Sequence, residues 1–266
     1  MIRNPYLMNP WTKLSIEFAN QRNYLDELFR VYPMAPDNVR ELDEKKWAAV
    51  ETAFKRQSNT ELVSALLKLK LFPIKDSYVA YLKRDLGAIE RNPATVDRLA
   101  GRLFEMGLDA IWTRCSEPKE TNRQIGPLFA RWLQKGSLGV PLLSVDQFRS
   151  TNTNAVLWGN DAQLMSYARE HLDYRGTKGL DLVARFNGKY VIGEAKFLTD
   201  FGGHQNAQFE DAKAVLTERH ARAERVAVLD GVLYITGNNK MHKHLQQKHN
   251  HNIMSALLLR DFLYQL

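Results

Sequence analysis

The sequence predicts an α/β (α+β) fold, a mixed β-sheet flanked by helices, preceded by a mostly helical N-terminal region. Apolar residues recur at three- and four-residue spacings through the first 150 residues, as on helices that bury one face. Two apolar runs flank Asn187-Gly188, which is the strongest short signal for a β-hairpin. Helical patterns precede and follow this hairpin, so helices and strands alternate in the second half.

The N-terminal half is expected to hold five helices. Pro33 ends the first of them, Pro93 favours the start of the fourth, and Gly136 follows the fifth. The spacing of apolar residues places these helices at 11–32, 43–56, 60–71, 94–106 and 119–134.

In the second half, a helix is expected that Asn160 or Asp161 can cap. Gly202 and Gly203 let the chain turn from the hairpin into another helix. Periodicity leaves open whether the C-terminal run is a strand or a helix. In order, the patterns predict a helix at 160–174, strands at 179–186 and 189–198, a helix at 205–223, a strand at 225–236 with a break at Asp230-Gly231, and the undecided run at 252–266.

Composition narrows the class of protein. No apolar run approaches the roughly 20 residues that span a bilayer, and the N-terminus lacks the apolar core of a secretory signal. One cysteine, Cys115, excludes an internal disulfide framework and a multi-cysteine zinc site. We therefore expect a cytoplasmic protein without a membrane partner.

The chain is basic, with a formal net charge of +7, which favours polyanionic partners and nucleic acid first. Residues 1–150 hold 23 Lys/Arg against 18 Asp/Glu, so most of the surplus lies in the helical half. The segment 118–133 offers donors that can meet phosphates and base edges. A solvated helix face is the plainer alternative, which we favour for any single one of them. These donors are Lys119, Asn122, Arg123 and Gln124.

Charged side chains interrupt the second strand of the hairpin. Glu194 and Lys196 are two residues apart, so they share one face, and Asp181 on the first strand is offset from the turn by a similar amount. The three are expected to meet near one end of the hairpin. Cross-strand charge pairs on a solvated hairpin are the alternative. Apolar residues on both faces argue against it, because unpaired charge is costly in a central strand.

Two neighbouring carboxylates raise each other's pKa unless a cation neutralises them. Lys196 supplies one positive charge, and a hard divalent cation such as Mg²⁺ would supply two. A cation held there can polarise a phosphodiester and activate water. The lysine can orient or deprotonate that water, or neutralise the transition state. This combination points to phosphodiester hydrolysis.

The pattern "GLD", followed after twelve residues by "EAK", resembles the PD-(D/E)XK nuclease superfamily, and the chain looks most like a type II restriction endonuclease. The resemblance covers about residues 160–240 and departs from the motif at Leu180, where proline is usual. It implies a restriction-endonuclease-like core that binds Mg²⁺ through Asp181, Glu194 and the carbonyl of Ala195. It also implies that Lys196 is the catalytic lysine. A further acid from the preceding helix would be Glu170 or, second in order, Asp173.

Two less regular segments follow the hairpin. Gln205 and Gln208 share a helical face and can bind water or the DNA backbone, with ordinary helix capping as the alternative, and His204 is a candidate phosphate contact. The run "MHKHLQQKHNH" (241–251) lacks the i, i+4 histidine pairs of a zinc helix. We expect a solvated surface segment there, with a basic segment near DNA as the alternative.

These observations together predict a Mg²⁺-dependent type II restriction endonuclease that cuts double-stranded DNA. Residues 1–150 would bind and recognise DNA, and residues 151–266 would form the catalytic core. The resemblance further implies a homodimer, and a DNA methyltransferase in the same restriction–modification system. Two alternatives stay open: another PD-(D/E)XK nuclease for repair or junction resolution, and a DNA-binding protein with an inactive nuclease core.

Overall fold

The computed structural model describes residues 8–21, 23–33, 41–117, 125–247 and 250–266. The chain divides into two compact units, one formed by residues 1–34 and 121–266, here the sheet unit, and the other by residues 35–120, here the helical unit. This division differs from the expected boundary at residue 150. Helices near both ends of the N-terminal half pack on the sheet, and a local apolar pattern does not reveal its packing partner.

The sheet unit contains one mixed β-sheet, whose strands within the described residues follow the spatial order β1-β2-β3-β4-β5-β6. Two pairs of strands are antiparallel, β2 with β3 and β3 with β4. The other pairs, β1 with β2, β4 with β5 and β5 with β6, are parallel. The strands are β1 (Leu142–Leu143), β2 (Ala155–Leu157), β3 (Leu182–Phe186), β4 (Lys189–Leu198), β5 (Glu224–Gly231) and β6 (Asn252–Met254).

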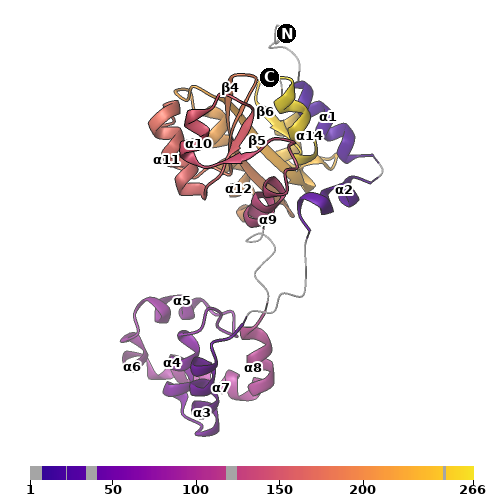
Figure 1. Cartoon of the computed structure of the whole chain (residues 1–266). Coiled ribbons are helices and arrows are strands. Elements are labelled where there is room, and N and C mark those ends of the chain that lie inside the picture. The colour runs from indigo at the N-terminus through magenta and orange to yellow at the C-terminus, as the bar shows by residue number, and fades with distance from the viewer. Residues whose placement is uncertain (1–7, 22, 34–40, 118–124, 248–249) are drawn as a thin grey trace. The chain divides into compact units, whose positions relative to one another are not determined.

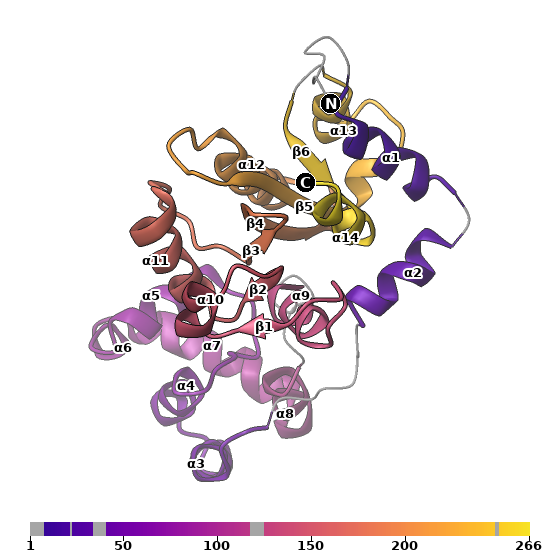
Figure 2. The ribbon, with the colours of Figure 1, turned by 45° about the horizontal axis from the view of Figure 1, so that its top comes forward.

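Helices cover both faces of this sheet (Figures 1 and 2). On β3 and β4, Val183 and Ile192 join a core with three of the helices, while Leu182, Ala184 and Val191 point into a core on the opposite face. The helices of the unit are α1 (Pro10–Ala19), α2 (Tyr24–Val31), α9 (Ile125–Gln134), α10 (Val145–Ser150), α11 (Asp161–Leu172), α12 (Gly203–Thr217), the 3-10 helix η2 (Val232–Tyr234), α13 (Lys240–Gln246) and α14 (Ala256–Tyr264).

Alternation along the strands explains the two cores, because successive side chains point to opposite faces. One core includes residues from α10 and α11, and the other includes residues from α2, α9 and α14. The mixed sheet flanked by helices is thus confirmed. Among the described helices, none is long and apolar enough to cross a membrane.

The helical unit has a separate apolar core. Leu62, Leu66, Leu99 and Leu103 are fully buried in it, and they recur at a four-residue spacing on two helices. Each unit therefore buries enough apolar surface to form a core of its own. The helices are α3 (Glu44–Lys55), α4 (Asn59–Leu67), α5 (Ser77–Arg84), α6 (Ala88–Arg91), α7 (Pro93–Met106) and α8 (Leu108–Cys115).

Several expected elements differ from those observed. The helix expected at 11–32 is two helices, separated around Asn23, which adopts a left-handed backbone with φ 74°. The strand expected at 225–236 ends at Gly231, as the break at Asp230-Gly231 predicted. The C-terminal run is both a strand and a helix. Because Gly231 lies so near Leu198 that a Cβ would meet its carbonyl oxygen at 2.1 Å, the chain must turn there without a side chain.

A buried carboxylate joins the N-terminal helices to the end of β5. Asp230 is fully buried and accepts hydrogen bonds from the hydroxyls of Tyr24 (3.1 Å), Tyr32 (3.2 Å) and Ser255 (2.5 Å) and from the amide of Ala256 (3.1 Å). Burial raises the pKa of Asp230 to about 6, although these hydrogen bonds oppose the rise. One side chain thereby fixes α2, β5 and α14 together.

Candidate active site

The β3–β4 hairpin predicted from Asn187-Gly188 is confirmed. The two turn residues have φ values of 50° and 77°, and the positive sign at both positions is the requirement of a tight type I′ turn. Pairing begins at Phe186 with Lys189 and ends at Leu182 with Gly193. Because β4 runs on to Leu198, its second half extends beyond its last β3 partner.

A local irregularity sets the position of Asp181. Leu182 is the registered partner of Gly193, yet the amide of Asp181 also donates to the Gly193 carbonyl, at 3.0 Å. Two residues therefore face one, as in a β-bulge, which redirects the side chains at its position. The Oδ2 atom of Asp181 accepts a hydrogen bond from the Ala195 amide at 2.9 Å. A Cβ on Gly193 would lie 2.7 Å from Val226 Cγ1, so glycine allows β5 to approach here.

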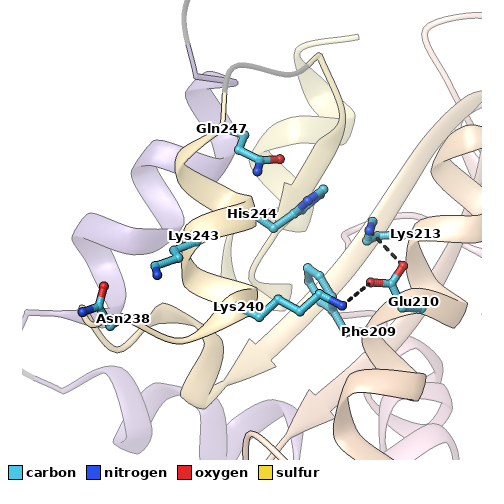
Figure 3. A pocket seen from close by; sticks show the side chains of 8 residues that line it. All are labelled: Phe209, Glu210, Lys213, Asn238, Lys240, Lys243, His244 and Gln247. Carbon is cyan, nitrogen blue, oxygen red and sulfur yellow. Dashed lines mark hydrogen bonds and ion pairs between the residues drawn. The ribbon is translucent and has the colours of Figure 1, made fainter. Parts of the chain in front are cut away.

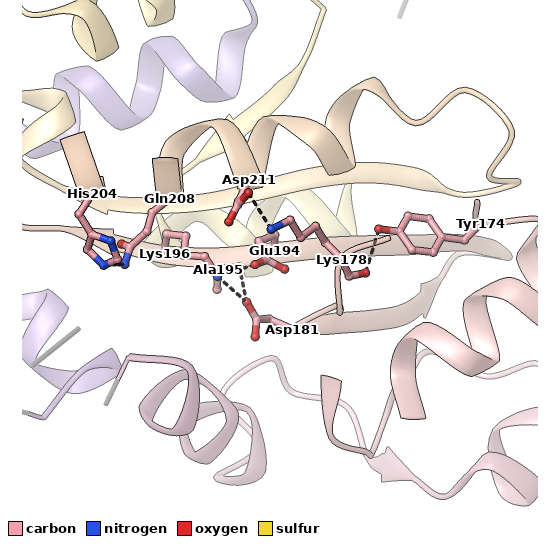
Figure 4. A network of polar contacts seen from close by, with 9 residues as sticks. All are labelled: Tyr174, Lys178, Asp181, Glu194, Ala195, Lys196, His204, Gln208 and Asp211. Carbon is pink, nitrogen blue, oxygen red and sulfur yellow. Dashed lines mark hydrogen bonds and ion pairs between the residues drawn. The ribbon is translucent and has the colours of Figure 1, made fainter. Parts of the chain in front are cut away.

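The structure brings Asp181, Glu194 and Lys196 together, as Figure 4 shows. Lys196 Nζ lies 3.7 Å from Asp181 Oδ2 and contacts Glu194 Oε1 directly. Glu194 is buried, and Asp181 and Lys196 are half-buried. Two carboxylates thus converge on one ammonium group, where β4 extends beyond the end of β3.

The electrostatics show that this cluster is short of positive charge. Burial raises the pKa of Asp181, although Lys196 and the Ala195 amide oppose the rise. Burial, and then the charge of Asp181, raise the pKa of Glu194 to about 7. Burial alone would lower the pKa of Lys196, but the two carboxylates outweigh it and the pKa is raised. A further cation beside the carboxylates would stabilise their charged forms.

The donor set fits a hard divalent cation. Asp181 and Glu194 offer carboxylate oxygens. The amide and carbonyl of one strand residue point to the same edge, so the Ala195 carbonyl faces the edge on which its amide meets Asp181. Within the described residues, no group of three or more His, Cys, Asp or Glu side chains could hold a metal. Mg²⁺ commonly uses only one or two carboxylates, with water and phosphate oxygens completing its shell.

The acids expected from the preceding helix have other surroundings. Glu170 is exposed and accepts a hydrogen bond from Ser166 Oγ at 2.9 Å. Asp173 forms an ion pair with Arg222, with 2.7 Å between Oδ2 and Nε. Both lie toward the C-terminal end of α11, and Glu170 is about 13 Å along the helix axis from its first residue, Asp161.

Asp161, which the sequence suggested only as a cap, is the acid of α11 whose charge reaches the cluster. Its negative charge contributes to the raised pKa of both Asp181 and Glu194. The chain passes close to it before β3, because a Cβ on Gly179 would lie 2.8 Å from Asp161 Cβ. Asn160 caps the helix through its side chain, which leaves the carboxylate of Asp161 available for another role. Gly179 permits this approach because it has no side chain, but the local sequence does not reveal which residue it approaches.

The residues expected on the following helix lie at the start of α12. Gln205 is buried and binds Thr199 twice: its Oε1 accepts from the Thr199 amide and its Nε2 donates to the hydroxyl, both at 3.3 Å. It thereby closes the loop between β4 and α12. His204 Nε2 lies 3.2 Å from Gln208 Nε2, and Figure 4 shows both above the strand that carries Lys196.

A second ion pair lies in the same polar network. Lys178 Nζ is 3.0 Å from Asp211 Oδ1, and the Tyr174 hydroxyl donates to the Lys178 carbonyl at 3.2 Å (Figure 4). The charge of Asp211 contributes to the raised pKa of Lys196. Sequence reasoning missed this pair, because its partners come from a loop and from α12. By contrast, the predicted DNA-contacting residues Lys119, Asn122, Arg123 and Gln124 lie outside the described residues.

The expectation that 241–251 is a solvated surface segment is wrong for part of it. His242 is only 1% exposed, and its Nδ1 lies 3.2 Å from the Leu233 carbonyl oxygen. The ring of His244 packs edge-on against Phe209, with 5.4 Å between ring centroids. These histidines hold α13 against its neighbours, since one face of a helix can be buried while its lysines remain in solvent.

Comparison with known proteins adds one strong likeness. A family model described as "Tsp45I type II restriction enzyme" matches residues 9–266, which include both units and every residue of the cluster. No curated protein and no solved structure matches the chain.

Proposed function

The chain belongs to the Tsp45I type II restriction enzyme family, and we propose that it hydrolyses phosphodiester bonds at Asp181, Glu194 and Lys196 with a bound Mg²⁺. Family membership makes it a type II restriction endonuclease, a site-specific deoxyribonuclease that binds double-stranded DNA. The residues and the metal are our proposal. No observation favours a repair or junction-resolving nuclease, or an inactive nuclease core.

The observation that carries the proposal is the convergence of two carboxylates on one lysine at the end of a hairpin. Burying this much charge costs free energy, and such clusters are typical of functional sites. When bound, Mg²⁺ would polarise the scissile phosphodiester and lower the pKa of a coordinated water. Asp181, Glu194 and the carbonyl of Ala195 would hold it.

Lys196 can act in three ways: by orienting the attacking water, by deprotonating it, or by neutralising charge on the pentacovalent phosphorus. In the cation-free site, the neighbouring carboxylates raise the pKa of Lys196 and stabilise the proton on Nζ, which suits the first and third of these roles. As an ammonium group, Lys196 donates hydrogen bonds to a phosphate oxygen or to water. Charge on the phosphate oxygens increases toward the transition state, and a fixed ammonium stabilises it there.

We include Asp161 as the supporting acid from α11. Its charge acts on both Asp181 and Glu194, and it is fixed at the first position of a capped helix. An additional negative charge near the carboxylates favours cation binding. Glu170 remains a weaker candidate, because it is bonded to Ser166 and lies about 13 Å along α11 from Asp161. Gln205 and Gln208, with His204, stay candidates for contacts to water or to the DNA backbone.

Digestion of plasmid DNA with the purified full-length chain tests the function. With Mg²⁺ the digest should give discrete bands on a gel, and with a chelator it should leave the plasmid intact. A smear would indicate a nuclease without site specificity. Intact DNA with every divalent cation tried, despite DNA binding, would exclude the enzymatic proposal.

The assembly and the setting are also proposals. A palindromic site presents two equivalent strands, and a two-fold symmetric dimer places one active site on each. Light scattering of the free protein and of its DNA complex would report one or two copies.

A site-specific nuclease that acts in the cytoplasm also threatens its own cell's DNA. We therefore propose a partner methyltransferase, so that methylated host DNA should resist digestion.

A further inference from the structure

A cavity of about 380 Å³ lies between α12 and α13, in the sheet unit. Figure 3 shows side chains from both helices around it, with Phe209 at its base. Phe209 is buried, and Lys213 Nζ lies 5.6 Å from its ring centroid. The base of this pocket is therefore apolar, and its rim carries long basic side chains. We call it the α12–α13 pocket.

The rim has more positive than negative charge. Lys213, Lys240 and Lys243 line the pocket together with a single acid, Glu210. Glu210 Oε2 lies 2.9 Å from Lys213 Nζ, and its Oε1 lies 4.0 Å from Lys240 Nζ. Within the described part of the chain, Lys243 has no ion-pair partner. One carboxylate thus lies between two ammonium groups, and a third ammonium group remains beside them.

Such a rim fits an anion that can approach from solvent. The side chain of Lys240 is 78% exposed, and Lys243 is also exposed. A site that encloses a small free anion would use buried, fixed donors instead. Exposed lysines around an open pocket suit one phosphate of a larger polyanion, because their positive charges also attract its neighbouring phosphates.

The pocket shares a helix with the active site. The first residues of α12, among them Gln205, lie beside the loop that leaves β4, and Glu210 follows about 7.5 Å farther along the helix axis. Duplex DNA with its scissile phosphate at Lys196 extends beyond the cut in both directions, so its other backbone phosphates can meet further basic parts of the sheet unit. We propose that the α12–α13 pocket binds a backbone phosphate of the substrate DNA, outside the position that is cut. This inference rests on the proposed function.

Glu210 should weaken DNA binding although it lines the pocket. A phosphate entering the pocket competes with Glu210 for Lys213 and Lys240, so that the acid opposes DNA binding. Removing a lysine should weaken binding, and neutralising Glu210 should strengthen it. General electrostatics also predict these directions. The test therefore needs matched charge changes elsewhere on the sheet unit.

Lys13 and Glu17 on α1 supply those controls. They form an exposed ion pair with 3.7 Å between Nζ and Oε1, and the Lys13 side chain is 68% exposed. The dissociation constant of duplex DNA is measured for the full chain without divalent cation, so that the DNA stays intact. The variants Lys240→Gln, Lys243→Gln and Glu210→Gln are compared with Lys13→Gln and Glu17→Gln. Circular dichroism confirms that each is folded.

We expect each pocket lysine variant to bind DNA about three- to tenfold more weakly, with the slope of log K against log salt reduced by about one. Glu210→Gln should bind about two- to fivefold more tightly. Both α1 controls should stay within about twofold of the wild type. Equal changes in the pocket and control variants would overturn the inference, as would unchanged binding in Lys240→Gln and Lys243→Gln.

Inorganic phosphate distinguishes the two sources of the anion. Phosphate binding is measured by ³¹P NMR. If Lys240→Gln loses phosphate binding while its DNA affinity is unchanged, the pocket takes a free anion and the DNA assignment is wrong. Plasmid digestion by the wild type separates this outcome from failure of the proposed function. A wild type that cuts DNA, beside pocket variants with unchanged affinity, would contradict only the inference drawn from the pocket.

Discussion

The two units differ in what they bury. Of the buried polar or charged side chains among the described residues, Ser116 alone belongs to the helical unit, and the sheet unit holds the others. The latter include Arg185, Glu194, Asp230 and His242. Buried charge costs free energy unless it is paired, and the helical unit avoids this cost with an almost entirely apolar core. The sheet unit uses polar burial for its candidate site and for holding its helices in place.

Net charge follows the same division. Residues 35–120 contain 15 Lys/Arg and 14 Asp/Glu, whereas the rest of the chain contains 22 Lys/Arg and 16 Asp/Glu. The surplus of positive charge expected in the first 150 residues is therefore not in the helical unit. It lies in segments of that half that belong to the sheet unit. Attraction for the DNA polyanion should come mainly from the sheet unit. A role of the helical unit in recognition would depend on specific contacts.

The largest effect is expected at the cluster itself. Replacing Asp181 by Ala removes one carboxylate from the cation site and the acceptor of the Ala195 amide. Cleavage by Asp181→Ala should fall by about 10³-fold or more, with little change in circular dichroism. Quantified plasmid digestion checks it. Undiminished cutting would mean that the active site lies elsewhere, and that the polar core of the sheet unit serves only its structure.

Asp161 should give the next largest effect. We expect Asp161→Asn to reduce cleavage by about 10- to 100-fold at low Mg²⁺, with partial recovery at high Mg²⁺, because a supporting negative charge aids cation binding. Titration of the cleavage rate against Mg²⁺ measures this.

Asp146 offers the matched control for that variant. It lies in the first turn of α10, which also begins with a capping box, and it is exposed. Asp146→Asn should cleave DNA like the wild type. An equal loss in both variants would assign the effect to the start of a helix, through its dipole, and not to the active site.

Asp230 tests the structural use of buried charge. Asp230→Asn should lower the free energy of unfolding by about 2–4 kcal/mol at neutral pH, because its amide group cannot accept all four hydrogen bonds. The pKa of Asp230 is about 6 in the folded protein against 3.8 ordinarily, so the folded state binds the proton more tightly. The stability that this proton linkage adds is then full below about pH 4 and is lost as the pH rises through about 6, while the four hydrogen bonds to the carboxylate remain.

Urea unfolding between about pH 4 and about pH 7 measures that contribution. The wild type should lose on the order of 3 kcal/mol through Asp230 over this range, and the variant should lack this share. Asp181 and Glu194 have raised pKa values as well, so some decline in stability should remain in the variant. An identical pH dependence in the two proteins would show that Asp230 stays ionised throughout.

The smallest effect is expected in the helical unit. Asp76 caps α5 through the Tyr78 amide and lies 2.7 Å from Arg98 Nη1. Arg98, by its hydrogen bond, lowers the pKa of Asp76. Asn caps a helix as well as Asp does, and surface ion pairs add little, so Asp76→Asn should barely change urea unfolding. A loss as large as that of Asp230→Asn would break the contrast between the units.

Local sequence was enough to predict the hairpin and its cluster. The positive φ of Asn187 and Gly188 follows from their residue types, and the two-residue period of a strand places Glu194 and Lys196 on one face. Pairing across the tight turn then brings Asp181 near them. These features depend on residues close together in the chain, so their geometry is fixed by backbone preferences and by register.

Other features depend on packing between distant segments. The approach of Asp161 to the cluster requires α11 to dock on β3, and the α12–α13 pocket requires two helices separated by β5. Asp230 finds partners more than 190 residues away, in Tyr24 and Tyr32. A single sequence contains no periodicity that marks such contacts.

By itself, the sequence determined the class of fold, the hairpin and the chemical identity of the cluster, because each follows from local backbone geometry and side-chain type. The tertiary structure alone decided which helices join the sheet, which acid of α11 acts electrostatically on the cluster, and where a basic rim surrounds a pocket. Those choices minimise exposed apolar surface and unpaired charge over the whole chain, and that balance is reached only when distant segments pack.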